Sequence, residues 1–179
     1  LAGPAGIGKR LTATAVAQAF NCLNPVTSPA PPATSEASSA ASDLPFDACG
    51  HCSPCRRIAR GSFPDVVALE RPPDRAGISV EQVRTATAEI AFRPFEGRRR
   101  VIVIDDASEL NADAQDALLK SLEEPPPTAA FLLVTAWPDA LRPTIRSRCA
   151  RLRFGALPAS DVAAWLEAHQ QLDARRART

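Results

Sequence analysis

A glycine-rich segment, GPAGIGKR at residues 3–10, is the first part of the chain that could bind a ligand. It fits the phosphate-binding pattern G-x-x-x-x-G-K, in which backbone N–H groups and the positive end of the following helix surround phosphates. The Ser or Thr that ligates Mg²⁺ in this pattern is Arg10 here. We expect a nucleotide site with inefficient hydrolysis or a vestigial site; a glycine turn without a ligand is the alternative. The residues assigned to nucleotide binding in this loop are Gly3, Gly6, Gly8, Lys9 and Arg10.

A run of apolar residues, 101–104, ends in Asp105 and Asp106. A buried parallel strand that delivers a carboxylate at its end is the Walker B arrangement of P-loop proteins. Asp105 is predicted to hold Mg²⁺ directly or through water. Asp106 lies where hydrolysing proteins often place Glu to orient water, which makes it a catalytic candidate. It is a weak one, because its side chain is one methylene shorter than that of Glu. The alternative is a core strand that merely ends in acid, and the glycine-rich loop makes the Walker B interpretation the better one.

Four of the five cysteines, Cys22, Cys49, Cys52 and Cys55, have the spacing of a metal site. Four thiolates suit tetrahedral Zn²⁺, and with all four positions taken by protein the site is predicted to be structural rather than catalytic. The long gap between Cys22 and Cys49 costs little, because loop closure depends weakly on length. His51 is a spare ligand or, more in keeping with four cysteines, an exposed or supporting residue. Free buried cysteines are the alternative.

The arginines offer two further candidates. Arg148, in the stretch TIRSRC, lies just before the last predicted strand, where an arginine on its own is usually a surface charge. Residues 98–100 are three consecutive arginines, which favour either a phosphate-contacting patch or, as the better interpretation, a solvated loop before a buried strand. Cys149 is predicted to be a small buried hydrophobe.

The elements that must position these residues alternate between strand and helix. Strands are predicted at 66–70, 101–105, 131–135 and 151–154. Helices are predicted at 9–20, at 80–92 after a Ser79 cap, from an Asn111 cap to about residue 124, at 141–146 and at 160–169. This alternation predicts an α/β fold with a parallel, doubly wound sheet. Residues 25–42 are rich in Pro, Ala, Ser and Thr and predict a disordered linker.

Composition narrows the functional classes. The 179 residues are 45% apolar and have a net charge of +1, which gives no overall attraction to nucleic acid or to a membrane surface. No apolar run reaches membrane-spanning length and no signal peptide is apparent, so we expect a cytoplasmic protein. Because the sequence has no methionine, we expect its true start to lie upstream.

The combined motifs resemble the AAA+ clamp-loader subunits of bacterial DNA polymerase III. The resemblance rests on LAGPAGIGKRL, on CGHCSPCRRI, on the stretch from Gly97 to Thr135 that contains LLKSLEEPPP, and on TIRSRC. It covers essentially the whole chain except residues 24–48. Within the family, the chain looks most like the delta-prime subunits, with the gamma/tau subunits second, because Arg10 and Asp106 depart from the hydrolysing pattern.

The resemblance implies an AAA+ P-loop core with an αβα sandwich over residues 1–155, without its first strand. Within that core it implies a zinc module at 21–60, interrupted by the disordered linker 24–48, and then the start of a helical lid at 156–179. It also implies that Arg148 acts as an arginine finger in a neighbouring subunit and that Thr135 lies near the sensor position of the nucleotide site. Zn²⁺ is the implied structural cofactor, whereas ATP with Mg²⁺ is doubtful.

Three hypotheses about function follow. The main one is an accessory, stator-like clamp-loader subunit that hydrolyses little ATP itself. Its implied partners are the gamma/tau and delta subunits, the sliding clamp and primer-template DNA reached through the complex, with no membrane. The second is an active gamma/tau-type motor in which Lys9 and Asp105 bind Mg²⁺ and ATP. The third is a zinc-containing repair or recombination ATPase that contacts DNA through residues 98–100.

Overall fold

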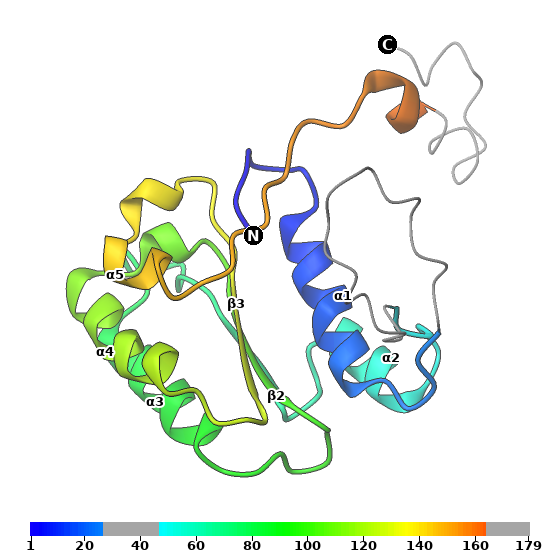
Figure 1. The fold of residues 1–179 in the computed structure, drawn as a ribbon, viewed down its shortest axis with the longest axis horizontal. Helices are drawn as coiled ribbons and strands as arrows, with labels where there is room; N and C mark the ends of the chain where they lie inside the picture. The colour runs from blue at the N-terminus through cyan, green and yellow to red at the C-terminus, as the bar shows by residue number, and fades with distance from the viewer. Residues whose placement is uncertain (27–46, 164–179) are drawn as a thin grey trace, which may run out of the picture.

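The computed structural model describes residues 1–26 and 47–163. Its centre is a parallel sheet whose strands lie in the order β1 (Val66–Leu69), β2 (Arg100–Ile104), β3 (Ala129–Leu133). One face is covered by α1 (Lys9–Asn21) and α2 (Ser53–Ala59). The other side holds α3 (Val80–Ile90), α4 (Ala112–Glu123) and α5 (Pro143–Arg146), with short 3-10 helices at Ala107–Glu109 and Pro138–Ala140 (Figure 1). The predicted parallel α/β sandwich is confirmed.

Strand β2 is buried on both faces, which explains its continuous apolar sequence. Ile102 and Ile104 pack toward α3 and α4, whereas Val101 and Val103 pack toward α1. Neighbouring side chains of a strand point to opposite faces, so one five-residue strand contributes to two hydrophobic cores. The sheet therefore has no solvent-facing side along β2.

The first residues of the chain lie between the segment that follows β3 and residues 152–154. Ala2 pairs in parallel with both Thr135 and Arg153, and its N–H donates to the carbonyl of Leu152 at 2.9 Å. The prediction of a strand at 151–154 is wrong. Arg153 pairs with Ala2 alone, because the chain turns into the glycine-rich loop directly after Ala2, and one isolated pair does not make a regular strand. The strand predicted at 131–135 is β3, which lies two residues earlier in the chain. Its pairing with β2 begins at Ala129, opposite Arg100, and ends at Leu133, opposite Ile104.

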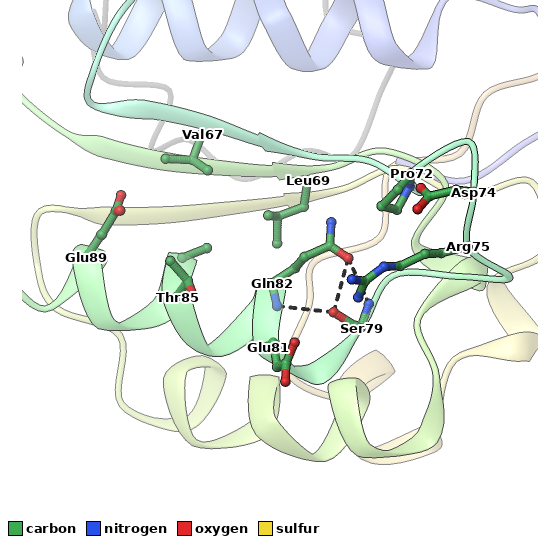
Figure 2. Close-up of a pocket in the computed structure, with 11 residues that line it drawn as sticks. Val67, Leu69, Pro72, Asp74, Arg75, Ser79, Glu81, Gln82, Thr85 and Glu89 are labelled. Atoms are coloured by element: carbon green, nitrogen blue, oxygen red, sulfur yellow. Dashed lines mark hydrogen bonds between the residues drawn. The ribbon is translucent and has the colours of Figure 1, made fainter.

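Helices α3 and α4 begin at the predicted caps, whereas α2 was not predicted from the sequence. The Ser79 hydroxyl accepts from the N–H of Gln82 at 3.4 Å, and the Gln82 side chain accepts from the N–H of Ser79 at 3.0 Å, which completes a capping box (Figure 2). The side chain of Asn111 accepts from the N–H of Ala114 at 2.8 Å and starts α4. The short helix predicted at 141–146 begins at Pro143. Across residues 1–26 and 47–163, none of the helices has the length and apolarity needed to cross a lipid bilayer.

Part of the predicted organisation falls outside the described residues. Of the predicted linker 24–48, Val26 and Asp47 form an antiparallel pair with N–H···O distances of 3.0 and 3.3 Å, and 27–46 are not described. Of the helix predicted at 160–169, residues up to 163 are helical, beginning at 159. The boundaries proposed for the core, the zinc module and the lid remain predictions.

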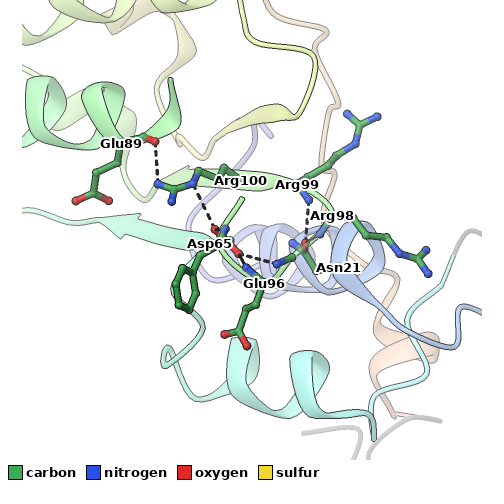
Figure 3. A network of polar contacts seen from close by, with 9 residues as sticks. Asn21, Asp65, Glu89, Glu96, Arg98, Arg99 and Arg100 are labelled. Atoms are coloured by element: carbon green, nitrogen blue, oxygen red, sulfur yellow. Dashed lines mark hydrogen bonds and ion pairs between the residues drawn. The ribbon is translucent and has the colours of Figure 1, made fainter. Parts of the chain in front are cut away.

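A buried carboxylate holds the turn that leads into β2. Asp65 accepts hydrogen bonds from the backbone N–H groups of Phe95, Glu96 and Gly97 at 2.7–2.8 Å, and Arg100 Nε lies 3.3 Å from Asp65 Oδ1 (Figure 3). Burial alone would raise the pKa of Asp65, but these backbone donors and the Arg100 guanidinium outweigh it. The pKa therefore lies below its ordinary value.

The last residue of α1 holds the same turn from the other side. Asn21 Oδ1 accepts from the N–H groups of Arg98 and Arg99 at 2.9 and 3.0 Å, while Asn21 Nδ2 donates to the carbonyl of Ala17 (Figure 3). A Cβ added to Gly97 would lie 2.5 Å from Asn21 Oδ1, so this position has no room for a side chain. The turn thereby fixes the end of α1 against the sheet.

The run of three arginines is not a uniform basic patch. The Arg100 side chain is largely buried, is paired with Asp65 and donates to the carbonyl of Glu89 at 2.8 Å. The Arg99 guanidinium lies over the ring of Phe20, 5.1 Å from its centroid. The side chains of Arg99 and Arg100 therefore have partners within the protein. Neither interpretation of the sequence, a solvated loop or a phosphate-contacting patch, predicted these contacts.

We predict that Asp65→Asn lowers the free energy of unfolding at pH 7 by about 3 kcal/mol, because a buried set of charge-assisted hydrogen bonds is weakened. The folded-state pKa of Asp65 is below the unfolded value, so its contribution is complete above the unfolded pKa and is lost as pH falls through the folded one. Denaturant titrations should show the difference between wild type and variant shrinking below about pH 4. Asp74→Asn, at an exposed carboxylate, is the matched control. A difference that stays constant from pH 7 to pH 3 would contradict the assignment.

Candidate functional site

The predicted nucleotide residues gather at the carboxyl ends of the parallel strands. All of them except Gly3 line a cavity of about 260 Å³ between the glycine-rich loop, the end of β2 and the segment after β3. Ligands of open α/β sheets bind at this edge, where the strand order leaves a crevice. The lining residues are Ala5, Gly6, Gly8, Lys9, Arg10, Asp105, Asp106, Val134, Thr135 and Ala136. The structure therefore brings both predicted motifs and Thr135 to one place.

The glycine-rich loop has the backbone of a phosphate cradle. Gly6 and Gly8 have φ values of 76° and 88°, which glycine adopts without strain. Gly3 lies against the carbonyl of Phe154, where an added Cβ would be 2.3 Å from the oxygen. Lys9 is buried, and its Nζ donates to the carbonyls of Gly3 and Pro4 at 2.8 and 2.6 Å. In this structure its ammonium group is thus bound by the loop's own carbonyls.

Arg10 has partners that the sequence did not suggest. Its Nη1 lies 3.0 Å from Asp105 Oδ2, and its Nη2 contacts Glu70 Oε1 at the end of β1. The guanidinium therefore pairs with the carboxylate that was predicted to hold Mg²⁺. Glu70 was missed as a site residue because a single acidic residue after a short strand gives no motif.

Asp106 and Thr135 are both engaged within the protein. Asp106 is the one non-glycine residue with positive φ in the described parts of the chain, at 53°, and Ser108 Oγ contacts its Oδ1. Thr135 is buried, and its hydroxyl oxygen accepts from the N–H of Trp137 at 2.9 Å. Each of these two side chains therefore has one partner within its own chain.

A second cavity of about 320 Å³ lies on the α1 and α2 side of the sheet and shares a wall with the first. Arg10 and Asp105 line both cavities, and Glu70 lines the second. A separate open groove of about 540 Å³ runs between β1 and α3, where Val67 and Leu69 form its apolar floor (Figure 2). None of the predicted site residues lines this groove.

The four predicted metal ligands come together at the far end of α1. The sulfurs of Cys22, Cys49, Cys52 and Cys55 all lie within 4.8 Å of one another, and Cys22 Sγ is 4.0 Å from Cys52 Sγ. Four thiolates around one Zn²⁺ at about 2.3 Å are separated by about 3.8 Å, so the cluster has the dimensions of a tetrahedral site. His51 is exposed and its Nδ1 contacts the carbonyl of Cys49. It is outside the four-cysteine group.

The surroundings of the cluster are arranged for sulfur. The N–H groups of Cys49 and Cys52 donate to the sulfurs of Cys22 and Cys49 at 3.3 and 3.4 Å. Burial raises the pKa of Cys55 to about 12; burial also acts to raise the pKa of Cys52, but hydrogen bonds from the backbone at Leu23 and Cys55 lower it to about 6. A bound cation would favour the thiolate form of all four groups. These residues can therefore hold a metal ion.

Arg148 lies outside the nucleotide cavity of its own chain. It follows α5, and its Nη2 is 2.7 Å from Glu123 Oε1 at the end of α4 while its Nη1 donates to the carbonyl of Thr144 at 2.9 Å. Both side chains of the ion pair are partly exposed. Cys149 is half-buried and packs against the core cluster that contains α4.

Comparison with known proteins identifies the family. The family described as "DNA polymerase III, delta subunit" matches residues 1–158. The chain is 36% identical over 167 residues to the DNA polymerase III subunit delta' of Pseudomonas aeruginosa, which covers 93% of this chain and 44% of that protein. It is 38% identical over 119 residues to the delta' subunit of Escherichia coli, covering 66% of this chain and 35% of that protein. A tau/gamma subunit from Haemophilus influenzae is 32% identical over 160 residues, 89% of this chain and 20% of the relative.

Solved structures give the same fold. A gamma subunit-related protein of DNA polymerase III from Thermotoga maritima superimposes with a TM-score of 0.51 at 25% identity, covering 68% of this chain and 46% of that one. Thermotoga maritima RuvB superimposes with a TM-score of 0.53 over 99% of this chain and 45% of its own length; at 14% identity it supports the AAA+ fold alone. The chain spans less than half the length of these relatives. The chain belongs to the DNA polymerase III delta subunit family and, within it, is similar to the delta-prime subunits.

Proposed function

We propose that this chain is part of a delta-prime-like accessory subunit of a clamp loader, the complex that places a sliding clamp on primed DNA during replication. The observation that supports this most is the similarity to a delta' subunit along 93% of the chain. Its partners would be the gamma/tau and delta subunits, and through the complex the clamp and primer-template DNA. We also propose a cytoplasmic location, where cysteines stay reduced and free to bind metal.

The subunit would act mainly by donating Arg148 to the nucleotide site of a neighbour. Two observations support this role: Arg148 lies away from its own cavity, and its ion pair with Glu123 is partly exposed. An exposed pair contributes only about 0–1 kcal/mol, so phosphate oxygens of a neighbouring nucleotide can replace Glu123. A guanidinium in that position stabilises the charge on a transferring phosphoryl group.

The subunit's own hydrolysis would be weak. Arg10 takes the place of the magnesium hydroxyl and pairs with Asp105, and Asp106 is held by Ser108. The alternative, an active gamma/tau-type motor, needs Lys9 and Asp105 to bind Mg²⁺ and ATP. Because Lys9 and Asp105 are both bound to other protein groups here, we favour the stator role.

The metal in the four-cysteine cluster is proposed to be Zn²⁺. Sulfur ligands in a compact tetrahedral set select zinc over oxygen-preferring cations, and four protein ligands leave no open position for catalysis. The module joins α1 to α2, where Gln18 Nε2 also donates to the carbonyl of Cys55 at 2.7 Å. The metal would thus stabilise the packing of these two helices.

We predict that Arg148→Ala lowers the steady-state ATPase rate of an assembled clamp-loader complex severalfold, because an arginine finger accelerates one nucleotide site by about 10³-fold or more. Lys9→Ala should have a much smaller effect, within about twofold, since this chain's own turnover contributes little. Arg142→Ala, at an arginine paired with Asp116, is the matched control. Equal effects of the Arg148 and Lys9 variants, or a larger effect at Lys9, would overturn the stator role.

We predict that the purified protein contains one Zn²⁺ per chain, measured by elemental analysis after gel filtration, and that Cys55→Ser removes it. Chelation should lower the midpoint of thermal unfolding by at least about 5 °C, because metal binding contributes to folding. Cys149→Ser, remote from the cluster, should keep the metal. Zinc retained by the Cys55 variant, or absent from the wild type, would argue against the site.

A further inference from the structure

We infer that the positively charged guanidinium of Arg10 takes the place that Mg²⁺ occupies in hydrolysing P-loop proteins. Arg10 thereby excludes Mg²⁺ from this site. The inference deepens the proposed function, since it gives the reason for weak hydrolysis. It rests on that function only in taking the glycine-rich loop as a nucleotide site. Its test uses the isolated subunit and is separate from the test of Arg148.

The geometry that supports this inference is a bridge between two strands. The carboxylates of Glu70 and Asp105 follow adjacent strands, β1 and β2, at the same edge of the sheet. Arg10 Nη1 is 3.0 Å from Asp105 Oδ2, and Arg10 Nη2 contacts Glu70 Oε1. One guanidinium, which carries five donors in a planar fork, thus pairs with both carboxylates at once.

The residues present do not fit Mg²⁺. This ion needs about six oxygen ligands at about 2.0–2.1 Å in nearly octahedral geometry. The hydroxyl of the usual pattern is replaced by a side chain that has no acceptor atoms and stays protonated. One of the two Asp105 carboxylate oxygens, Oδ2, already accepts from Arg10. A divalent ion would therefore have to displace the like-charged Arg10 guanidinium from Glu70 and Asp105, the two carboxylates with which it is paired.

Replacing Arg10 should uncover a cation site. Arg10 and Asp105 form the wall shared by the two cavities, and Glu70 lines the second of them. With serine at position 10, the hydroxyl and the carboxylates of Asp105 and Glu70 would be the oxygen ligands that Mg²⁺ prefers. The Arg10 side chain is 60% exposed, and such an ion pair adds little to stability, so the variant should fold.

The experiment measures the binding of a fluorescent ATP analogue to the full-length subunit, with and without Mg²⁺, for wild type and Arg10→Ser. We expect wild type to bind weakly, with an affinity that changes less than about twofold on adding Mg²⁺. Arg10→Ser should bind at least about tenfold more tightly when Mg²⁺ is added. Mn²⁺, detected directly by its electron paramagnetic resonance signal, should bind Arg10→Ser with nucleotide and not the wild type.

Two controls make the outcome specific. Asp105→Asn in the Arg10→Ser background should abolish the gain, whereas Arg10→Lys, which keeps a positive charge, should remain independent of Mg²⁺. Wild-type binding that strengthens tenfold with Mg²⁺ would overturn the inference, as would an Arg10→Ser variant without any dependence on Mg²⁺. If Arg10→Ser failed to fold by circular dichroism, Arg10→Thr, which also carries a hydroxyl and no charge, would take its place in the same titrations, with the same expected and overturning results.

Discussion

Burial of the sheet on both faces confines polar chemistry to the two edges where the strands begin and end. Ile102 and Ile104 face one core while Val101 and Val103 face the other, so strand β2 carries no polar side chain after Arg100, its first residue. At the carboxyl edge this constraint brings together Lys9, Arg10, Asp105 and Thr135. At the opposite edge it leaves Asp65, which must find its partners in the turn before β2 because a buried charge without partners is costly.

Helix α1 connects these two edges. Its first residues belong to the glycine-rich loop and the Arg10 bridge, and its last residue, Asn21, holds the turn before β2. Cys22 follows directly and begins the cysteine cluster. A thirteen-residue helix rises about 20 Å, so one rigid element sets the spacing between the nucleotide cavity and the metal module. The metal module and the nucleotide site share no residue, but both are attached to the ends of the same helix.

The elements with strong local signals were predictable from the sequence. The apolar run before Asp105 identified β2, and the side chains of Ser79 and Asn111 gave the starts of two helices, because caps and buried runs act over a few residues. The residues that the sequence could not supply act over long separations. Glu70 lies sixty positions from Arg10, and Asp65 some thirty from its partners in the turn, so their roles depend on the topology of the sheet. The segment around Arg153 gave a strand-like pattern, but pairing with Ala2 alone leaves it a bridge.

The antiparallel pair of Val26 and Asp47 has a consequence for the tolerance of the chain to insertion. These two residues are held side by side by hydrogen bonds of 3.0 and 3.3 Å, one just after Cys22 and the other just before Cys49. This pairing fixes the positions at which a connecting segment of any length begins and ends. The entropic cost of closing that segment grows only slowly with its length. This point of the fold is therefore a natural place to add or remove sequence, or to insert a reporter domain, without disturbing either site.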